Sequence, residues 1–441
     1  VVTEISLDAF NVIANTDLSL YHYINNPVAI ATLAGFVFFL GTAAGSYPAF
    51  YLSSFSPIKV LKGKLSNGFK GTMLRNSLVV VQFTISVALI TSTFFVQKQL
   101  NYVSNLNLGF ESENILQIQN MEMLSPEQQE TFETMLGSNP AFDEVGLSDM
   151  VPPQVWNEDK YKAYGPDTEV VTLNRIRCDE GYLDLLDLNF VQGRNFDKTR
   201  GTDQHKVILN ASAVKALGWE YPINPNNSPV GQHITFPNSN QALFEVIGVV
   251  EDFNFNSVRF EISPLLIINE DNDYMWEGGK DFISARINPQ VVQSRADLTS
   301  QINSIKQILG EINPSIPFEY SFMDQQFEAN FRTEQQMGQI LNIFTIMALS
   351  IACLGLFGLS AFASEQRKKE LGIRKVLGAS VQQLVASFTR EFSMLIVISI
   401  LIASPLAYFF IRNWLANFAY KTPIEAWVFV LVGITSVVIA W

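Results

Sequence analysis

The sequence has very little cysteine and histidine. Cys178 and Cys353 are its two cysteines, and His22, His205 and His233 are scattered along 441 residues. One cysteine belongs to a charged body and the other to an apolar run, so the two cannot pair into a disulfide framework. Histidines this far apart lack the ligand spacing of a zinc site. The sequence therefore predicts neither a disulfide scaffold nor a metal site.

Catalytic motifs are also lacking. The chain has no G-x-S-x-G nucleophile elbow and no G-x-x-x-x-G-K-[ST] phosphate-binding loop. Its acid pairs, Glu158-Asp159 and Glu251-Asp252, are adjacent in sequence, an arrangement that does not indicate a general acid and base. The charged body is acidic, which disfavours nucleic acid. These absences predict a non-catalytic protein with no catalytic residues, no cofactor of its own and no nucleic-acid partner.

Charge is missing from several long stretches. No Asp, Glu, Lys or Arg lies between Asp17 and Lys59, Arg75 and Lys98, Glu334 and Glu365, or Glu391 and Arg412, nor after Glu425. A helix that crosses a bilayer core needs about 20 apolar residues. We therefore expect membrane spans at residues 27–52, 76–97, 337–363, 392–411 and 425–441. The alternative, buried helices of a soluble core, is disfavoured because soluble helices rarely stay uncharged for so long.

The charges that are present separate along the chain. Residues 98–336 contain 35 acidic and 16 basic side chains, whereas the rest contains 7 acidic and 13 basic. The linker 53–75 holds five basic and no acidic residues, and the loop 364–391 holds six basic against three acidic. Because basic loops stay in the cytoplasm, we expect both segments there. Residues 1–26, 98–336 and 412–424 are then expected outside.

The acidic body, residues 98–336, has the pattern of a mixed α+β domain. Runs rich in Val, Ile and Phe predict strands at 114–119, 169–178, 244–251, 264–269, 282–287 and 317–322. Helices are predicted at 126–136, 210–217 and 291–309. Helical stretches at 97–106 and 324–336 would join the body to the adjacent spans as continuous stalks. The predicted fold class is a multi-span α-helical membrane protein with a large extracytoplasmic α+β domain.

Small residues in two of the expected spans suit close helix packing. Gly41 and Gly45 are four residues apart in the first span, and Gly355 and Gly358 lie in the third. Glycines at such spacing let a second helix approach closely. Local flexibility without a partner is the alternative, and the spacing alone does not decide between them.

The loop 364–391 has the pattern of one amphipathic helix. Its apolar residues recur at three- and four-residue steps: Ile373, Val376, Leu377, Val381, Leu384, Val385 and Phe388. Basic residues occupy the opposite face, where Glu370 lies four residues before Arg374, the spacing of a helical ion pair. Such a helix either lies on anionic lipid or docks to a cytoplasmic partner.

This loop also resembles a family signature. Residues 365–380, EQRKKELGIRKVLGAS, closely resemble the signature of FtsX-like permeases of the MacB type. The segments FEVIGVVEDFNF (244–255) and GRNF (193–196) resemble the MacB-type periplasmic core, and MDQQF (323–327) resembles the entry to its permease module. The whole chain is most similar to two-unit permeases of Bacteroidetes-type bacteria. On that resemblance it is the C-terminal part of such a protein.

The resemblance implies a domain order. Residues 1–26 end a preceding extracytoplasmic segment, 27–52 are the last span of a first unit, and 53–75 are a cytoplasmic linker. The second unit begins with the span 76–97 and continues through the MacB-like core and its stalks, 98–336. Residues 337–441 form the FtsX-like permease module, with the coupling loop 364–391 between its first two spans.

The resemblance further implies the membrane subunit of an ABC transporter in the cell inner membrane, with residues 98–336 periplasmic. A separate ATPase would bind ATP and Mg²⁺ and dock on Glu370, Leu371, Gly372, Ile373, Arg374, Lys375, Gly378 and Ala379. Its hydrolysis cycle would move the external domain by mechanotransmission, to export or extract an amphipathic substrate. The alternative is a transmembrane switch that activates an external partner such as a cell-wall hydrolase. Membrane lipid and a periplasmic adaptor or lipoprotein are the other expected partners.

Overall fold

The computed structural model describes residues 7–8, 10–12, 16–19, 25–53, 69–223, 227–237, 242–272, 274 and 280–441. Most of the predicted segment 1–26 and of the linker 53–75 therefore lies outside the described residues. The chain divides into two compact units. The helical unit comprises Val1–Leu100, Thr333–Ala416 and Thr422–Trp441, and the α+β unit comprises Asn101–Arg332 and Asn417–Lys421.

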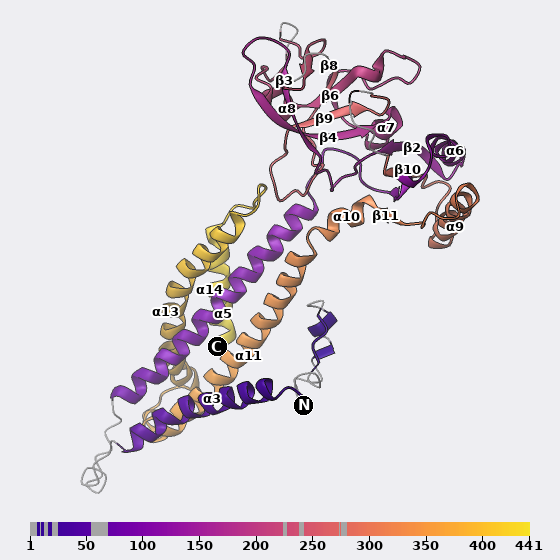
Figure 1. The fold of residues 1–441 in the computed structure, drawn as a ribbon. Coiled ribbons are helices and arrows are strands. Elements are labelled where there is room, and N and C mark those ends of the chain that lie inside the picture. Colours follow the sequence, from indigo (N-terminus) through magenta and orange to yellow (C-terminus); the bar gives the residue numbers. More distant parts are fainter. Residues whose placement is uncertain are drawn as a thin grey trace. The chain divides into compact units, whose positions relative to one another are not determined.

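The helical unit is built from long apolar helices (Figure 1). They are α3 (Pro27–Ser53), α5 (Phe69–Ser104), α11 (Arg332–Gln366), α13 (Val381–Leu415) and α14 (Ala426–Ala440), and the short, charged helix α12 (Lys368–Val376) lies between α11 and α13 in the sequence. Three stretches are long and apolar enough to cross a membrane: Arg75–Ser104, Arg332–Gln366 and Val381–Leu415. Pro27–Thr42 and Ala426–Ala440 are shorter apolar helices. The expected spans 27–52 and 425–441 coincide with these shorter helices, so five membrane crossings stay a prediction.

Helix α5 contacts three other helices of this unit. The hydroxyls of Thr93 and Thr345 of α11 are 2.9 Å apart, and Ser399 of α13 donates a hydrogen bond to the carbonyl of Val80 at 3.1 Å. The ammonium of Lys98 lies 3.0 Å from the carboxylate of Glu425, the residue that precedes α14. Uncharged hydroxyls can satisfy each other inside an apolar bundle, whereas the ion pair of Lys98 with Glu425 lies at the helix ends.

The exit from the α+β unit differs from the prediction of one continuous stalk helix over 324–336. Helix α10 (Met323–Ala329) ends in a turn at Asn330 and Phe331, and α11 begins at Arg332. At the break, the aromatic ring of Phe331 is buried against Val103 and Val258. The prediction of one continuous helix was therefore wrong.

The α+β unit contains one sheet of eleven described strands. They are β1 (Ile115–Ile118), β2 (Phe142–Ser148), β3 (Glu158–Ala163), β4 (Val170–Cys178), β5 (Phe190–Gly193), β6 (Lys206–Asn210), β7 (His233–Thr235), β8 (Leu243–Val250), β9 (Leu265–Asn269), β10 (Phe282–Ile287) and β11 (Tyr320–Phe322). The helices of this unit besides α10 are α6 (Pro126–Gly137), α7 (Glu180–Leu186), α8 (Ala211–Ala216) and α9 (Arg295–Ile312), with short 3₁₀ turns at Met121–Met123 and Asp203–His205.

Six of these strands close on themselves. Their order is β4-β3-β7-β8-β6-β9, and β9 returns to pair with β4 in parallel. Every strand of this ring contributes to one buried cluster, which includes Tyr161, Leu173, Val207, Ile234, Phe244 and Leu266. Burial of each such side chain contributes about 1.5–3 kcal/mol to the stability of the fold. Because β9 pairs with β4, none of the six strands has a free edge within the ring.

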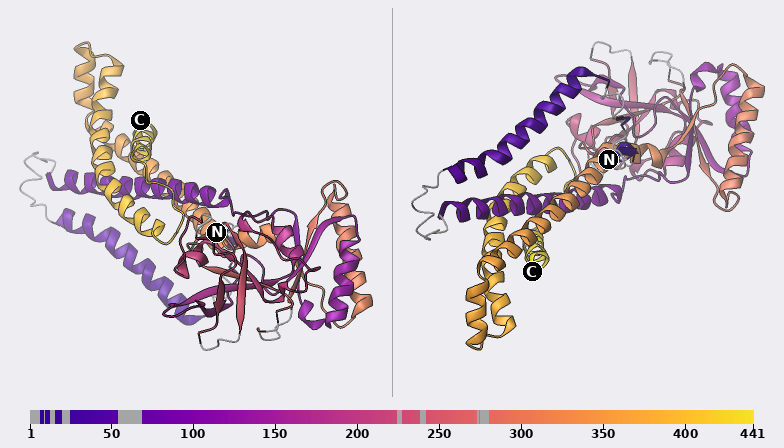
Figure 2. Two further views of the ribbon diagram at one scale, coloured as in Figure 1. Left: turned by 90° about the horizontal axis from the view of Figure 1, so that it is seen from above. Right: turned by 90° about the horizontal axis from the view of Figure 1, so that it is seen from below.

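A second lobe continues from β4 through β2, β10 and β1 to β11. Helices α6 and α9 lie side by side on it (Figure 2) and share a core that contains Phe132, Leu136, Ile305 and Leu309. Each of these two helices begins with a capping box, formed by Ser125 with Gln128 and by Ser294 with Asp297. A capping box satisfies the free amide groups of the first turn. Helix α6 begins at the predicted residue 126, whereas α9 begins at Arg295, four residues after the predicted start at 291, because its capping box forms at Ser294.

Candidate functional site

The loop 364–391 contains the end of α11, helix α12, a turn and the first three turns of α13. Helix α12 ends at Val376, and Gly378 has φ +94°, a left-handed conformation that glycine adopts without strain. Ser380 then caps α13, because its hydroxyl accepts a hydrogen bond from the amide of Gln383. The prediction of a single amphipathic helix was therefore wrong. The left-handed Gly378 ends one helix and the capping Ser380 begins the next, although the apolar residues continue at helical spacing across both.

The break divides the predicted apolar stripe into two sets. Leu384 and Val385 line a cavity of about 630 Å³ together with Leu356 and Phe392. Ile373, Val376 and Leu377 of α12 are 62%, 89% and 81% exposed, and Val381 and Val385 of α13 are 64% and 59% exposed. The side chain of Phe388 lies outside the described residues. Exposed apolar residues thus lie both at the C-terminal end of α12 and on the first turns of α13.

Ion pairs connect the charged residues of this loop. The guanidinium of Arg367 donates hydrogen bonds to both carboxylate oxygens of Glu391, at 2.7 and 3.1 Å. The predicted pair of Glu370 and Arg374 is confirmed, with nitrogen and oxygen 2.6 Å apart. Exposed pairs contribute only about 0.2–1 kcal/mol each. Their main effect is geometric, since Arg367 ties the start of α12 to α13.

The residues predicted to dock an ATPase are adjacent in the structure. Glu370 to Lys375 all lie on α12, and Gly378 and Ala379 form the turn that follows. Their docking role stays a prediction. The sequence analysis missed the pairing of Arg367 with Glu391, because the two residues are 24 positions apart and no local period connects them.

The glycines predicted to pack helices have different surroundings. A Cβ atom on Gly355 would lie 3.0 Å from the side-chain oxygen of Gln82 of α5, so this position is close to a second helix. A Cβ atom on Gly41, Gly45 or Gly358 would meet no atom of the described chain within 4 Å. Any helix that packs on these three glycines has to come from outside the described residues.

Two further glycines mark close helix contacts that the sequence analysis did not identify. A Cβ atom on Gly338 of α11 would lie 3.4 Å from Val96 and Leu100 of α5. A Cβ atom on Gly433 of α14 would lie 3.4 Å from Ile400 of α13. Neither glycine has a second glycine three or four positions away, which is the spacing that drew attention to the others.

In the α+β unit, two of the sequence segments that carry the resemblance meet. Strand β5 pairs with β8, and Gly193 lies opposite Gly248. A Cβ atom on Gly193, whose φ is +84°, would lie 2.0 Å from the carbonyl oxygen of Ile247. Only glycine fits here, because any side chain would overlap the neighbouring strand. The segments GRNF and FEVIGVVEDFNF are therefore parts of one structural feature.

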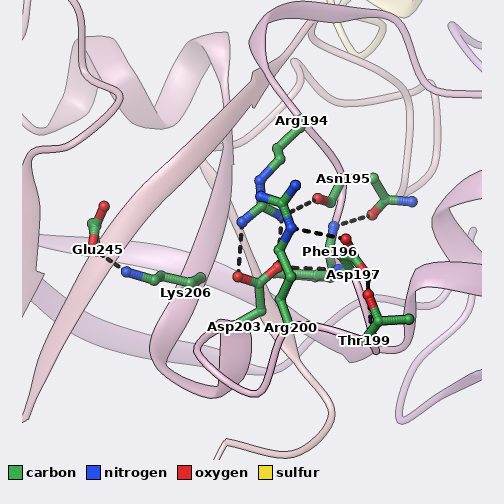
Figure 3. Close-up of polar contacts among 9 residues, drawn as sticks. All are labelled: Arg194, Asn195, Phe196, Asp197, Thr199, Arg200, Asp203, Lys206 and Glu245. Atoms are coloured by element: carbon green, nitrogen blue, oxygen red, sulfur yellow. Dashed lines mark hydrogen bonds and ion pairs between the residues drawn. The ribbon is translucent and has the colours of Figure 1, made fainter.

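The polar residues around this feature hold the chain that follows β5 (Figure 3). Both terminal nitrogens of Arg194 donate to the buried carboxylate of Asp203, at 2.6 and 2.8 Å. The amide of Asp197 donates to the same carboxylate at 3.1 Å. These hydrogen bonds, above all those from Arg194, lower the pKa of Asp203. The arrangement fixes the loop between β5 and β6.

In the acid pair Glu251-Asp252, Asp252 has a structural role. The carboxylate of Asp252 accepts hydrogen bonds from the amide and the hydroxyl of Ser212, at 2.8 and 2.9 Å. It thereby satisfies the first turn of α8. Within the described part of the chain, no group of three His, Cys, Asp or Glu side chains has the arrangement of a metal site.

Comparisons with known families match both parts of the chain. The family model described as MacB-like periplasmic core domain matches residues 80–301, and the model described as FtsX-like permease C-terminal matches residues 342–441. The first of these matches covers half of the chain.

Among curated proteins, the chain is similar to two ATP-binding/permease proteins. The pyoverdine export protein PvdT of Pseudomonas syringae is 23% identical over 203 residues, which are 43% of this chain and 29% of that protein. The macrolide export protein MacB of Aggregatibacter actinomycetemcomitans is 24% identical over 220 residues, 48% of this chain and 31% of that protein. The chain thus matches less than a third of the length of these relatives.

Among solved structures, similar chains are isolated domains. The periplasmic region of MacB from Actinobacillus actinomycetemcomitans is 19% identical, with a TM-score of 0.35, over 52% of this chain and 97% of that one. The extracellular domain of the ABC-type transporter YknZ is 17% identical, with a TM-score of 0.32, over 48% of this chain and all of that one.

Proposed function

The chain belongs to the family of FtsX-like permeases with a MacB-like periplasmic core domain, and from this premise we propose that it relays the ATPase cycle of a partner to its external domain. Membership makes it a membrane permease component of the MacB-like ABC transporters, and the family implies a cytoplasmic ABC ATPase as partner. The curated relatives combine ATP-binding and permease functions in one name. Here we propose that the ATPase is a separate protein that docks on α12.

One observation carries the proposal of mechanotransmission. Helix α13 is continuous from Val381, in the loop 364–391, to Leu415. The segment that follows it, Asn417–Lys421, belongs to the α+β unit. A single helix therefore has the coupling loop at one end and a segment of the external domain at the other.

The contacts of the segment Asn417–Lys421 are specific. The amide of Ala419 donates a hydrogen bond to the carbonyl of Arg259 at 2.9 Å. The guanidinium of Arg259 lies 5.5 Å from the centre of the Phe418 ring, a cation–π geometry. Tyr420 packs on the buried side chains of Val103 and Phe331. A displacement of α13 along its axis would act on the α+β unit through these contacts.

We further propose that residues 98–336 lie in the periplasm and handle an amphipathic substrate. Trp156 and Phe260 of the α+β unit are 63% and 65% exposed, and we propose them as apolar contacts for this substrate. The chain has no Asp, Glu, Lys or Arg between Glu334 and Glu365, nor between Glu391 and Arg412. An ion pathway usually needs such residues inside the membrane. We therefore propose that the substrate is handled at the outer face of the membrane and not along an ion pathway through the helices.

The test is charge reversal on α12. Arg374 and Lys375 changed together to Glu should abolish stimulation of the ATPase, because their positive charges are on the docking helix, while folding and insertion stay unchanged. The matched control reverses Lys160 and Lys162 of β3, which changes the net charge equally in the α+β unit. ATPase binding and stimulation would be measured in detergent and in liposomes. Normal stimulation in the α12 double variant would refute the assignment.

Co-purification separates export or extraction from the alternative of a regulatory switch. The full-length protein would be isolated from its membrane in mild detergent, and the bound proteins identified. An ATPase together with an adaptor or lipoprotein supports export or extraction. An ATPase together with a cell-wall hydrolase that binds residues 98–336 supports the switch, and no ATPase contradicts both.

A further inference from the structure

A polar pocket of about 610 Å³ lies between α12 and the start of α13. Its lining combines three arginines, two glutamates, a serine and a methionine: Arg367, Glu370, Arg374, Ser387, Arg390, Glu391 and Met394. The two glutamates are already paired, Glu391 with Arg367 and Glu370 with Arg374. The side chain of Arg390 makes no hydrogen bond or ion pair with a described residue. The pocket therefore has one positive charge in excess, on a side chain that is available to a ligand.

An apolar stripe leads away from this pocket along α13. Ser387, Glu391, Met394, Ile398 and Leu401 follow each other at three- and four-residue steps and so share one helix face. Met394 and Leu401 are 68% and 70% exposed, and Ile398 is 37% exposed. At 1.5 Å per residue, the stripe from Met394 to Leu401 extends about 10 Å into the predicted span. A charged pocket thus continues directly into a face that can lie against an alkyl chain.

We propose that this pocket binds the headgroup of an anionic phospholipid of the cytoplasmic leaflet, with an acyl chain along Met394, Ile398 and Leu401. A phosphodiester carries one negative charge, which matches the excess of one arginine. The forked donors of arginine suit phosphate oxygens. The cytoplasmic leaflet is rich in anionic lipid, and basic pockets at this level are suited to bind it. The inference rests on the proposed topology, which puts the loop 364–391 in the cytoplasm.

The chemistry of the pocket alone would also suit inorganic phosphate or an acidic side chain of the ATPase. The apolar stripe decides between these occupants, since neither of the other two would use Met394, Ile398 and Leu401. A lipid bound here would contact α12 and α13 together. It would thereby hold the docking helix against the helix that we propose transmits its movement.

The experiment measures lipid binding to the purified full chain in detergent micelles, without ATPase. Dioleoyl phosphatidylglycerol is titrated against dioleoyl phosphatidylcholine, and bound lipid is counted by native mass spectrometry. We expect preferential retention of phosphatidylglycerol. Arg390→Gln should weaken this binding roughly tenfold, the loss that follows removal of one charged hydrogen bond. Arg412→Gln, the matched control at the other end of α13, should leave it unchanged.

Three outcomes would overturn the proposal. Equal binding of phosphatidylglycerol by Arg390→Gln and the unchanged chain would exclude the pocket. An equal loss in Arg412→Gln would indicate unspecific attraction of charge. Displacement of the lipid by an equimolar amount of inorganic phosphate would identify an anion site instead. Because no ATPase is present, failure of ATPase coupling would not alter these results, so the two proposals fail independently.

Discussion

At the scale of single residues, two carboxylates of the α+β unit have pKa values shifted in opposite directions. Asp203 is buried but accepts two hydrogen bonds from Arg194, which lower its pKa. Asp281 is half-buried, and burial together with the nearby charges of Glu122 and Asp149 raises its pKa to about 6. A shifted pKa makes folding stability depend on pH, and the direction of the shift determines the sign.

The first prediction concerns Asp203. Because its pKa is lower in the folded than in the unfolded chain, its stabilisation is complete above the unfolded value and is lost as pH falls below it. Asp203→Asn should lower the free energy of unfolding at pH 7 by about 1–3 kcal/mol. The loss should be smaller near pH 3. Thermal unfolding of the full chain in detergent measures this, with Asp197→Asn, a partly exposed neighbour, as the milder control. An equal loss at both pH values would contradict the role of the charge.

The second prediction has the opposite sign. The folded chain holds a proton on Asp281 at pH values where the unfolded chain has released it, so stability falls as pH rises from about 4 to 6. Asp281→Asn removes this cost and should raise the free energy of unfolding at pH 7 by about 1–2 kcal/mol. At pH 4 the variant should match the unchanged chain. Unfolding in urea at both pH values checks this, and destabilisation at pH 7 would refute it.

At the scale of elements, the turn between α12 and α13 is the decisive feature of the loop 364–391. Gly378 has a left-handed conformation, and Ser380 starts the next helix. The exposed end of α12 is consequently separated from the axis of α13. On the proposed docking role, α12 is a short helix with a defined turn between it and α13.

The third prediction tests this joint. Gly378→Ala places a side chain at φ +94°, which costs about 1–2 kcal/mol, and should reduce stimulation of the ATPase without loss of insertion. Gly310→Ala is the matched control, because this glycine lies inside α9, outside the docking residues, with no described atom within 4 Å of an added Cβ. That substitution should stabilise α9 slightly and preserve coupling. Unchanged stimulation in Gly378→Ala would mean that the left-handed turn is dispensable.

At the scale of the whole molecule, the proposed topology assigns the loop 364–391 and the α+β unit to opposite sides of a membrane. The loop 364–391 is basic, and the α+β unit is acidic. The thiol of Cys178 is buried, which raises its pKa and leaves it unreactive. Labelling of introduced cysteines can therefore report on sidedness after Cys353 alone is replaced by Ser.

The fourth prediction uses Glu311→Cys on α9 and Lys369→Cys on α12. In spheroplasts, a membrane-impermeant maleimide should modify the cysteine at position 311 at once. The cysteine at position 369 should react only after the membrane is permeabilised, because the proposed topology puts the positive loop in the cytoplasm. Labelling of both positions in intact spheroplasts, or of position 369 alone, would contradict the topology.

Much of the α+β unit follows from local sequence patterns, but not all of it. The strands predicted at 169–178, 244–251 and 282–287 and the helices predicted at 126–136 and 291–309 are all present. Strand β3 was missed because four of its six residues are charged. It exists because Tyr161 and Ala163 are buried while Glu158, Lys160 and Lys162 lie on the other face. Packing against distant strands thus outweighs a weak local preference.

The sequence by itself determined the family, the uncharged helices and most regular elements, because these depend on neighbouring residues and on the cost of placing charge in lipid. Only the tertiary structure decided four other features. They are the closure of β4 with β9, the meeting of Gly193 with Gly248, the pair of Arg367 with Glu391, and the packing of the segment Asn417–Lys421 on Arg259. Each joins residues far apart along the chain. Such contacts are selected by packing and hydrogen bonding in the folded molecule, and no local period encodes them.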